Sequence, residues 1–212
     1  MRFPYGIADF RAIIDEGYFY VDRTDRIPLI EEAGKQLLFL RPRRFGKSLW
    51  LSTLENYYDL ARAEDFGRLF GKLKIGQNPT PLHNRHFILK LNFSVVEPSG
   101  AHAAIHQALF DHVNTRIEDA LVRYAPWLGQ PARVHPDNAI ASLQSLLGAV
   151  SRTPYKLYLQ IDEYDNFANE VMISPLRGTD RYEALVRGEG TIKTFFKAIK
   201  EGAEGRGIDR AF

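Results

Sequence analysis

The sequence contains no cysteine, so disulfide bonds are excluded and a reducing cytosol is a compatible setting. No run of apolar residues approaches the roughly 18 needed to cross a bilayer. The opening residues Met1-Arg2-Phe3-Pro4 do not have the pattern of a secretory signal peptide. From these absences we expect a cytoplasmic protein without a membrane partner.

An excess of charge of one sign is also lacking, because 28 Lys and Arg nearly balance 26 Asp and Glu and leave a formal charge of +2. This balance does not decide whether nucleic acid is a partner, since such binding depends on a local patch. The six histidines are scattered without neighbouring acids at a metal-ligand spacing. What is present is 45% hydrophobic residues in a chain of 212, enough for one sizeable core and one α/β domain.

The segment Leu37 to Ser48 carries the most informative motif: Leu-Leu-Phe-Leu-Arg-Pro-Arg-Arg-Phe-Gly-Lys-Ser. Its apolar part predicts a buried strand over Gln36 to Leu40, and Leu49 to Tyr58 predicts an amphipathic helix directly after it. A Gly-Lys-Ser between strand and helix is typical of a phosphate-binding P-loop (Walker A). The first glycine of the usual pattern is replaced by Arg41.

Three residues of this loop keep the roles that phosphate binding requires. Gly46 allows the backbone to approach the phosphates, Lys47 reaches the β- and γ-oxygens, and Ser48 offers a hydroxyl to Mg²⁺. A basic surface loop with a chance Gly-Lys-Ser would show the same residues. The nearby arginines, Arg41, Arg43 and Arg44, would stabilise triphosphate charge, contact a nucleic-acid phosphate or only solvate the loop, and the sequence does not choose among these.

A second motif lies far downstream, where the apolar strand predicted from Lys156 ends in Asp162 and Glu163. This pattern resembles a Walker B segment, in which the first acid holds Mg²⁺ and the second activates the attacking water. Adjacent acids also cap ordinary strand ends, but the two motifs together favour a nucleotide site. If the two strands lie close together, Ser48 and Asp162 can share one Mg²⁺; placement on opposite edges of the sheet would exclude this.

The remaining pattern alternates helices and strands, which predicts a mainly parallel sheet covered on both faces. Further strands are predicted at Tyr18 to Val21, at Phe87 to Phe93 and around Arg210 to Phe212. Helices are predicted over Ala8 to Glu16, Ile27 to Ala33 with Thr24 or Asp25 as cap, Ala101 to Tyr124, a segment capped by Asp137 or Asn138, and Thr191 to Lys200.

The quoted residues, together with Phe19-Tyr20-Val21-Asp22-Arg23-Thr24 and Tyr164-Asp165, resemble the predicted AAA-ATPase-like family of bacterial proteins. In that family a loop without the first glycine is the usual form. The resemblance implies a P-loop NTPase fold of the AAA/STAND-like kind, with three α/β/α layers. It places nucleotide contacts at Arg43, Arg44, Phe45, Gly46, Lys47, Ser48 and Leu49, metal contacts at Ser48 and Asp162, and catalysis at Lys47 and Glu163.

The resemblance also implies that the chain is a fragment of one domain spanning residues 1–212. Residues 1–34 would form a helix-strand-helix lead-in, and residues 35–212 an incomplete nucleotide-binding core. Family members commonly continue through a sensor strand and a helical lid into a PD-(D/E)XK nuclease-like domain. Nucleic acid enters as a partner through that missing domain and through the three arginines of the loop, Arg41, Arg43 and Arg44.

Three hypotheses follow for the function. The first is an ATP-binding domain with Mg²⁺-dependent hydrolysis. The second is a nucleotide-dependent switch that hydrolyses poorly and controls an attached nuclease-like domain or a partner. The third, a P-loop kinase, is less favoured because the acid pair matches a hydrolase and no phosphoacceptor pocket is evident. A homo-oligomer stays open, since an arginine finger supplied in trans is not recognisable from one chain.

Overall fold

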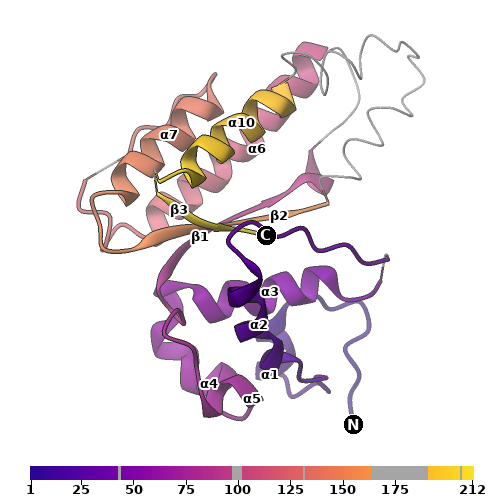
Figure 1. The fold of residues 1–212 in the computed structure, drawn as a ribbon. Helices are drawn as coiled ribbons and strands as arrows, with labels where there is room; N and C mark the ends of the chain where they lie inside the picture. Colours follow the sequence, from indigo (N-terminus) through magenta and orange to yellow (C-terminus); the bar gives the residue numbers. More distant parts are fainter. Residues whose placement is uncertain (43, 97–101, 131, 164–190, 206) are drawn as a thin grey trace.

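The computed structural model describes residues 1–42, 44–96, 102–130, 132–163, 191–205 and 207–212 (Figure 1). Its strands are β1 (His86–Asn92), β2 (Lys156–Asp162) and β3 (Ile208–Ala211). Its α-helices are α1 (Phe10–Asp15), α2 (Ile27–Ala33), α3 (Lys47–Tyr58), α4 (Phe66–Phe70), α5 (Lys74–Gln77), α6 (His102–Arg123), α7 (Ala139–Val150) and α10 (Thr191–Ala203). Short 3₁₀ turns are η1 (Thr24–Arg26), η2 (Leu60–Asp65) and η3 (Phe93–Val95).

The three strands form a parallel sheet in the order β1-β2-β3, which confirms the α/β class and the parallel pairing. The register pairs His86 with Lys156 at one end of the sheet and Asn92 with Asp162 at the other. Parallel strands end on the same side, so the carboxyl ends of β1 and β2 meet where the predicted acids lie.

Helices cover both faces of the sheet, with α6, α7 and α10 on one side and α1 to α5 on the other (Figure 1). Each face has its own core. Alternation along the strands sends Leu89 and Leu159 into the α6–α7–α10 core, and Ile88 and Tyr158 into the core of α1 to α5. This explains why β1 and β2 carry unbroken runs of large apolar or aromatic residues, Phe87-Ile88-Leu89 and Leu157-Tyr158-Leu159.

Helix α3 is fixed firmly on its face of the sheet, as its predicted amphipathic pattern requires. Leu54, Tyr57 and Tyr58 are fully buried in the core of α1 to α5. Glu55 accepts a hydrogen bond of 2.9 Å from the Lys90 ammonium of β1, which ties the helix to the strand. The packing of its C-terminal half therefore holds the first turn of α3 in place.

The strand predicted over Gln36 to Leu40 is wrong in its extent. Only Gln36 forms a parallel bridge, with Ala211, and the Leu37 N–H donates to the Ala211 carbonyl at 3.0 Å. Beyond this point no described strand lies alongside, so the segment continues as extended chain. Leu38 and Leu40 are 65% and 76% exposed and are not buried as predicted.

Two other local predictions need correction. Residues 18–21 form no strand: the Phe19 N–H bonds to the Arg2 carbonyl at 2.7 Å, outside the three-stranded sheet. Helix α2 has its predicted bounds, with Pro28 in the first turn, but Arg26 is its N-cap residue and provides no side-chain cap, because the turn η1 precedes it directly. By contrast, Asn138 caps α7 as predicted.

A charged cluster joins the segment before the loop to the starts of β1 and β3. Asp209 Oδ1 lies 2.9 Å from Lys35 Nζ, and Asp209 Oδ2 lies 3.0 Å from His86 Nε2. The His86 hydrogen bond first, and then Lys35, hold the pKa of Asp209 well below its ordinary value of 3.8, although partial burial opposes this. These contacts fix where the chain enters the loop.

Replacing Asp209 by asparagine is expected to lower the free energy of unfolding near neutral pH and to reduce its loss in acid. A carboxyl whose pKa is lowered by folding stabilises the fold above its unfolded pKa, and this contribution disappears as the pH falls below about 4. Urea unfolding at several pH values tests this, with Asp137→Asn, at an exposed carboxyl, as the control. Equal acid sensitivity of Asp209→Asn and the unmodified chain would contradict it.

Candidate functional site

The loop predicted to bind phosphate ends in a turn that opens directly into α3. Gly46 is the N-cap residue with φ of 78°, and Arg44 also has a positive φ of 65°. Gly46 offers no side chain to cap the helix, and the first helical bond runs from the Trp50 N–H to the Gly46 carbonyl at 2.9 Å. The backbone N–H groups of the first turn are thus uncapped, the arrangement that binds anions at helix N-termini.

The left-handed backbone at Gly46 leads to a stability prediction. A Cβ added there would meet nothing within 4 Å, so only the backbone conformation penalises Gly46→Ala. We expect a loss of about 1–2 kcal/mol in the free energy of unfolding. Gly67 in α4 is the matched control, because it also has open space but no positive φ, and alanine there should be neutral or stabilising by up to ~1 kcal/mol. Equal effects in urea unfolding would contradict this reasoning.

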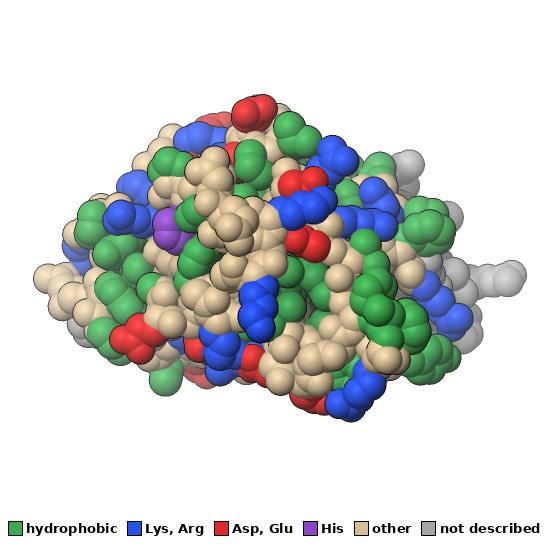
Figure 2. Space-filling view, turned by 90° about the horizontal axis from the view of Figure 1, so that it is seen from below, with side chains coloured by type: hydrophobic (Ala, Val, Ile, Leu, Met, Phe, Trp, Pro, Cys, Tyr) green, Lys and Arg blue, Asp and Glu red, His purple; other side chains and the backbone are tan. Residues whose placement is uncertain are grey.

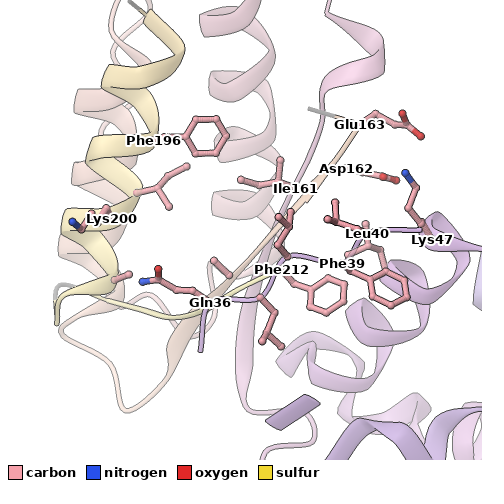
Figure 3. Close-up of a pocket in the computed structure, with 16 residues that line it drawn as sticks. Gln36, Phe39, Leu40, Lys47, Ile161, Asp162, Glu163, Phe196, Lys200 and Phe212 are labelled. Atoms are coloured by element: carbon pink, nitrogen blue, oxygen red, sulfur yellow. The ribbon is translucent and has the colours of Figure 1, made fainter. Parts of the chain in front are cut away.

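A cavity of about 600 Å³ connects this turn with the end of β2. Lys47 from the start of α3 lies on its wall with Asp162 and Glu163 (Figure 3). The other walls are mainly apolar and come from the extended segment after Lys35, from α10 and from the end of β3. They are Gln36, Leu37, Leu38, Phe39, Leu40, Leu51, Ile161, Phe196, Ile199, Lys200, Ala203, Ala211 and Phe212.

The two acids lie on the same side of the sheet end as Lys47. Asp162 is 6% exposed and lies at the last position of β2. Strand alternation would direct the next residue to the opposite face, but Glu163 has φ of 58° and breaks it. Figure 3 shows both carboxylates extending toward the side from which Lys47 approaches.

Neither Lys47 nor Asp162 has an ion-pair partner within the described part of the chain. The Asp162 carboxylate lies on the cavity wall without such a partner, so its negative charge favours a cation there. Oxygen ligands of this kind suit Mg²⁺, which usually binds proteins through one or two carboxylates and keeps waters and substrate phosphates as its other ligands. The described residues contain no cluster of three or more His, Cys, Asp or Glu side chains that could hold a metal ion by themselves. The donor set therefore fits Mg²⁺ bound together with a phosphate ligand.

The sequence-predicted site residues divide among several places. Lys47, Asp162 and Glu163 come together in one cavity, while Phe45, Gly46 and Leu49 line a neighbouring groove. Ser48 lies half-buried in the first turn of α3 and is not among the residues that line the cavity. Arg44 is exposed, and Arg43 lies outside the described residues.

The strand order shows how the two motifs, expected on close strands, lie relative to each other. Strand β3 lies between the loop segment and β2, so the two are not direct neighbours, and they are not on opposite edges either. The motifs meet because the segment before the loop and strand β2 both end at the same side of the sheet. No local pattern indicated that Phe196 and Phe212 line the cavity, because these residues belong to elements distant in the sequence.

Comparison with known proteins gives the following. The sequence profile of the AAA-ATPase-like family, described as predicted AAA-ATPase, matches residues 4–212. A protein of Azotobacter chroococcum mcd 1, named as an uncharacterized protein in the vnfD 5′ region, is 41% identical over 58 residues, which are 27% of this chain and 11% of that protein. The matched part thus spans about a tenth of that relative. No solved structure matches the chain, and no described helix has the length and hydrophobicity to cross a membrane.

Proposed function

Because the chain belongs to the predicted AAA-ATPase-like family, we propose that it binds ATP with Mg²⁺ at the turn before α3 and hydrolyses it. One observation carries this proposal: Lys47, Asp162 and Glu163 line the same cavity although 115 residues separate Lys47 from Asp162. A cation, an uncapped helix N-terminus and two acids are the groups that a triphosphate, its metal ion and an attacking water require. The parallel sheet with helices on both faces is compatible with the three-layer P-loop fold.

In this proposal the phosphates bind to the backbone N–H groups after Gly46. Lys47 neutralises the β- and γ-phosphate oxygens, and Arg44 adds positive charge near the loop. Asp162 would hold Mg²⁺ from the cavity wall, and the Ser48 hydroxyl, which lies outside that wall, would have to turn toward the ion to bind it too. The bound ion would supply further charge neutralisation. Asp162 shares the cavity wall with Lys47, so its carboxylate would lie on the same side as the bound phosphates.

Hydrolysis would use Glu163, on the cavity wall, as the general base. A water oxygen forms a bond to the γ-phosphorus while the bond between that phosphorus and the β,γ-bridging oxygen breaks, so that ADP and phosphate leave. Glu163 accepts the proton that the water loses.

A nucleotide-dependent switch is the second candidate, and one structural observation favours it. Within the described residues, the loop segment beyond Gln36 forms no further bridge to the sheet, and its Phe39 ring packs on the Phe212 ring with centroids 5.6 Å apart. Ligand binding at Lys47 would then change how this segment pairs with β3. The two candidates differ in turnover, and measuring phosphate release against ATP binding separates them.

An attached nuclease-like domain and a nucleic-acid partner stay predictions from the family resemblance. Those expectations depend on the whole proteins of the family. Sedimentation with and without ATP and Mg²⁺ would measure whether the chain forms a homo-oligomer.

A further inference from the structure

A second cavity of about 590 Å³ lies directly beside the phosphate-binding turn. It is formed by the first residues of the chain, by α2 and by the first turns of α3. Gly46 lies on its wall while the next residue, Lys47, lies on the wall of the first cavity, and Phe39 lines both. The turn before α3 therefore separates the two cavities, and a ligand bound across it would reach both.

Aromatic rings dominate the lining of this groove. They come from Phe3, Phe19, Tyr20, Phe39, Phe45 and Trp50. Phe3 and Phe45 are 67% and 61% exposed, and Phe19 is 39% exposed. Figure 2, which looks at the α1 to α5 side, shows hydrophobic side chains gathered at the surface next to Lys and Arg side chains. An exposed apolar surface of this kind indicates a binding site.

Positive charge surrounds the rings. Arg23, Arg26 and Arg41 all line the groove and are exposed, and none has a carboxylate partner within the described part of the chain. The Arg41 guanidinium lies over the Phe39 ring at 5.4 Å from its centroid. Aromatic faces next to unpaired cations fit a ligand with a flat ring system and an anionic part.

The groove offers few groups that would read the edge of a base. No Asp, Glu, Asn or Gln is among the described residues that line it. Its hydroxyls are already engaged, because Tyr20 Oη lies 3.2 Å from Thr53 Oγ1 and Thr53 Oγ1 donates to the Leu49 carbonyl at 2.9 Å. Recognition by stacking tolerates different bases, since every base presents a π-face.

From these observations we propose that the aromatic groove binds the base of the nucleotide whose phosphates bind at the turn after Gly46, and that it accepts adenine and guanine alike. The ligand class is thus a purine nucleoside triphosphate and not ATP alone. The inference rests on the proposed function, because it places the base relative to the phosphates. A cavity of this size suits one base with its sugar better than an extended single strand of nucleic acid.

Trp50 provides a direct probe, because it lies in the groove and Trp127 is the second tryptophan of the chain. In a Trp127→Phe background, ATP and GTP with Mg²⁺ should quench the Trp50 fluorescence with dissociation constants within about tenfold of each other. Inorganic tripolyphosphate should bind, as measured by calorimetry, without this quenching.

Two variants test the groove itself. Phe19→Ala should weaken ATP and GTP about tenfold and leave tripolyphosphate affinity unchanged, because stacking contributes about 5- to 150-fold per base. Arg23→Gln should weaken ATP and GTP about tenfold and tripolyphosphate less, because it removes a cation that lies over the base as well as a positive charge. Val122→Ala, at an 80% exposed position of α6, is the matched control and should change neither. Circular dichroism establishes that each variant is folded.

Several results would overturn the proposal. Unchanged ATP and GTP affinity in both groove variants would exclude the groove while leaving the phosphate site intact. A preference of a hundredfold or more for one purine would exclude base tolerance. If the variants lose binding of a single-stranded oligothymidylate but keep both nucleotides, the groove binds nucleic acid. If ATP, GTP and tripolyphosphate all fail to bind, the proposed function is itself wrong.

Discussion

Replacing Lys47 by alanine is expected to reduce the affinity for ATP about 100-fold, the largest effect on binding that we predict for a single side chain. A hydrogen bond from a charged donor contributes about 1.5–3 kcal/mol, and the ammonium also loses its attraction to the remaining phosphate charge. Lys47 makes no ion pair with a described carboxylate, so its removal leaves no new unpaired acid in contact with it. Stability should therefore change little.

Calorimetric titration with a non-hydrolysable ATP analogue measures this effect without turnover. Lys72→Ala is the control, because Lys72 is an exposed lysine between α4 and α5, outside both cavities. Retained affinity in Lys47→Ala would remove the P-loop assignment under the hydrolase, switch and kinase hypotheses together. Loss of affinity in Lys72→Ala as well would indicate a general charge effect.

Replacing Glu163 by glutamine is expected to reduce phosphate release by about 10²- to 10⁴-fold while ATP affinity is kept. Glutamine has the shape of glutamate but does not accept the proton of the attacking water. Because Asp162 is unchanged, the metal-binding carboxylate stays in place. Glu163→Gln is thus expected to lose turnover and keep ATP binding. Asp162→Asn, at the adjacent position, is expected to weaken the dependence of ATP binding on Mg²⁺.

Phosphate release and ATP binding, measured on the same samples, test this separation. Glu64→Gln, at an exposed position of η2, is the matched control and should leave both quantities unchanged. A Glu163→Gln variant that turns over at the original rate would exclude Glu163 as the base. Binding without turnover in the unmodified chain would favour the switch, and transfer of the γ-phosphate to a small molecule would indicate the kinase.

Much of the fold followed from local patterns. The bounds of β1, β2 and α3 were predicted to within one or two residues, since each has a strong apolar period and a clear start or end. The strand predicted at Gln36 to Leu40 was wrong in extent because a run of leucines looks buried whether or not a partner strand lies alongside. The length of the pairing was decided by β3, which bridges to Gln36 and to no later residue of this segment.

The site was predictable in part for a related reason. Lys47, Asp162 and Glu163 belong to motifs whose residue types and spacing carry the chemistry, so the sequence pointed to them. The aromatic groove was not predictable, because Phe3, Phe19 and Trp50 belong to three separate segments that read individually as ordinary apolar residues. Likewise Phe196 and Phe212 reach the first cavity only through the packing of α10 and β3.

The sequence by itself determined the kinds of elements and the groups that can bind a phosphate, since both depend on residue type and short-range spacing. The tertiary structure alone decided that β3 lies between the loop segment and β2, and that Glu163 and Asp162 face the same side. It also decided that three arginines without an ion pair to any described carboxylate border an aromatic groove. These features depend on strand order, on one left-handed backbone position and on contacts between distant segments, because long-range pairing and packing are not encoded in any single stretch of the chain.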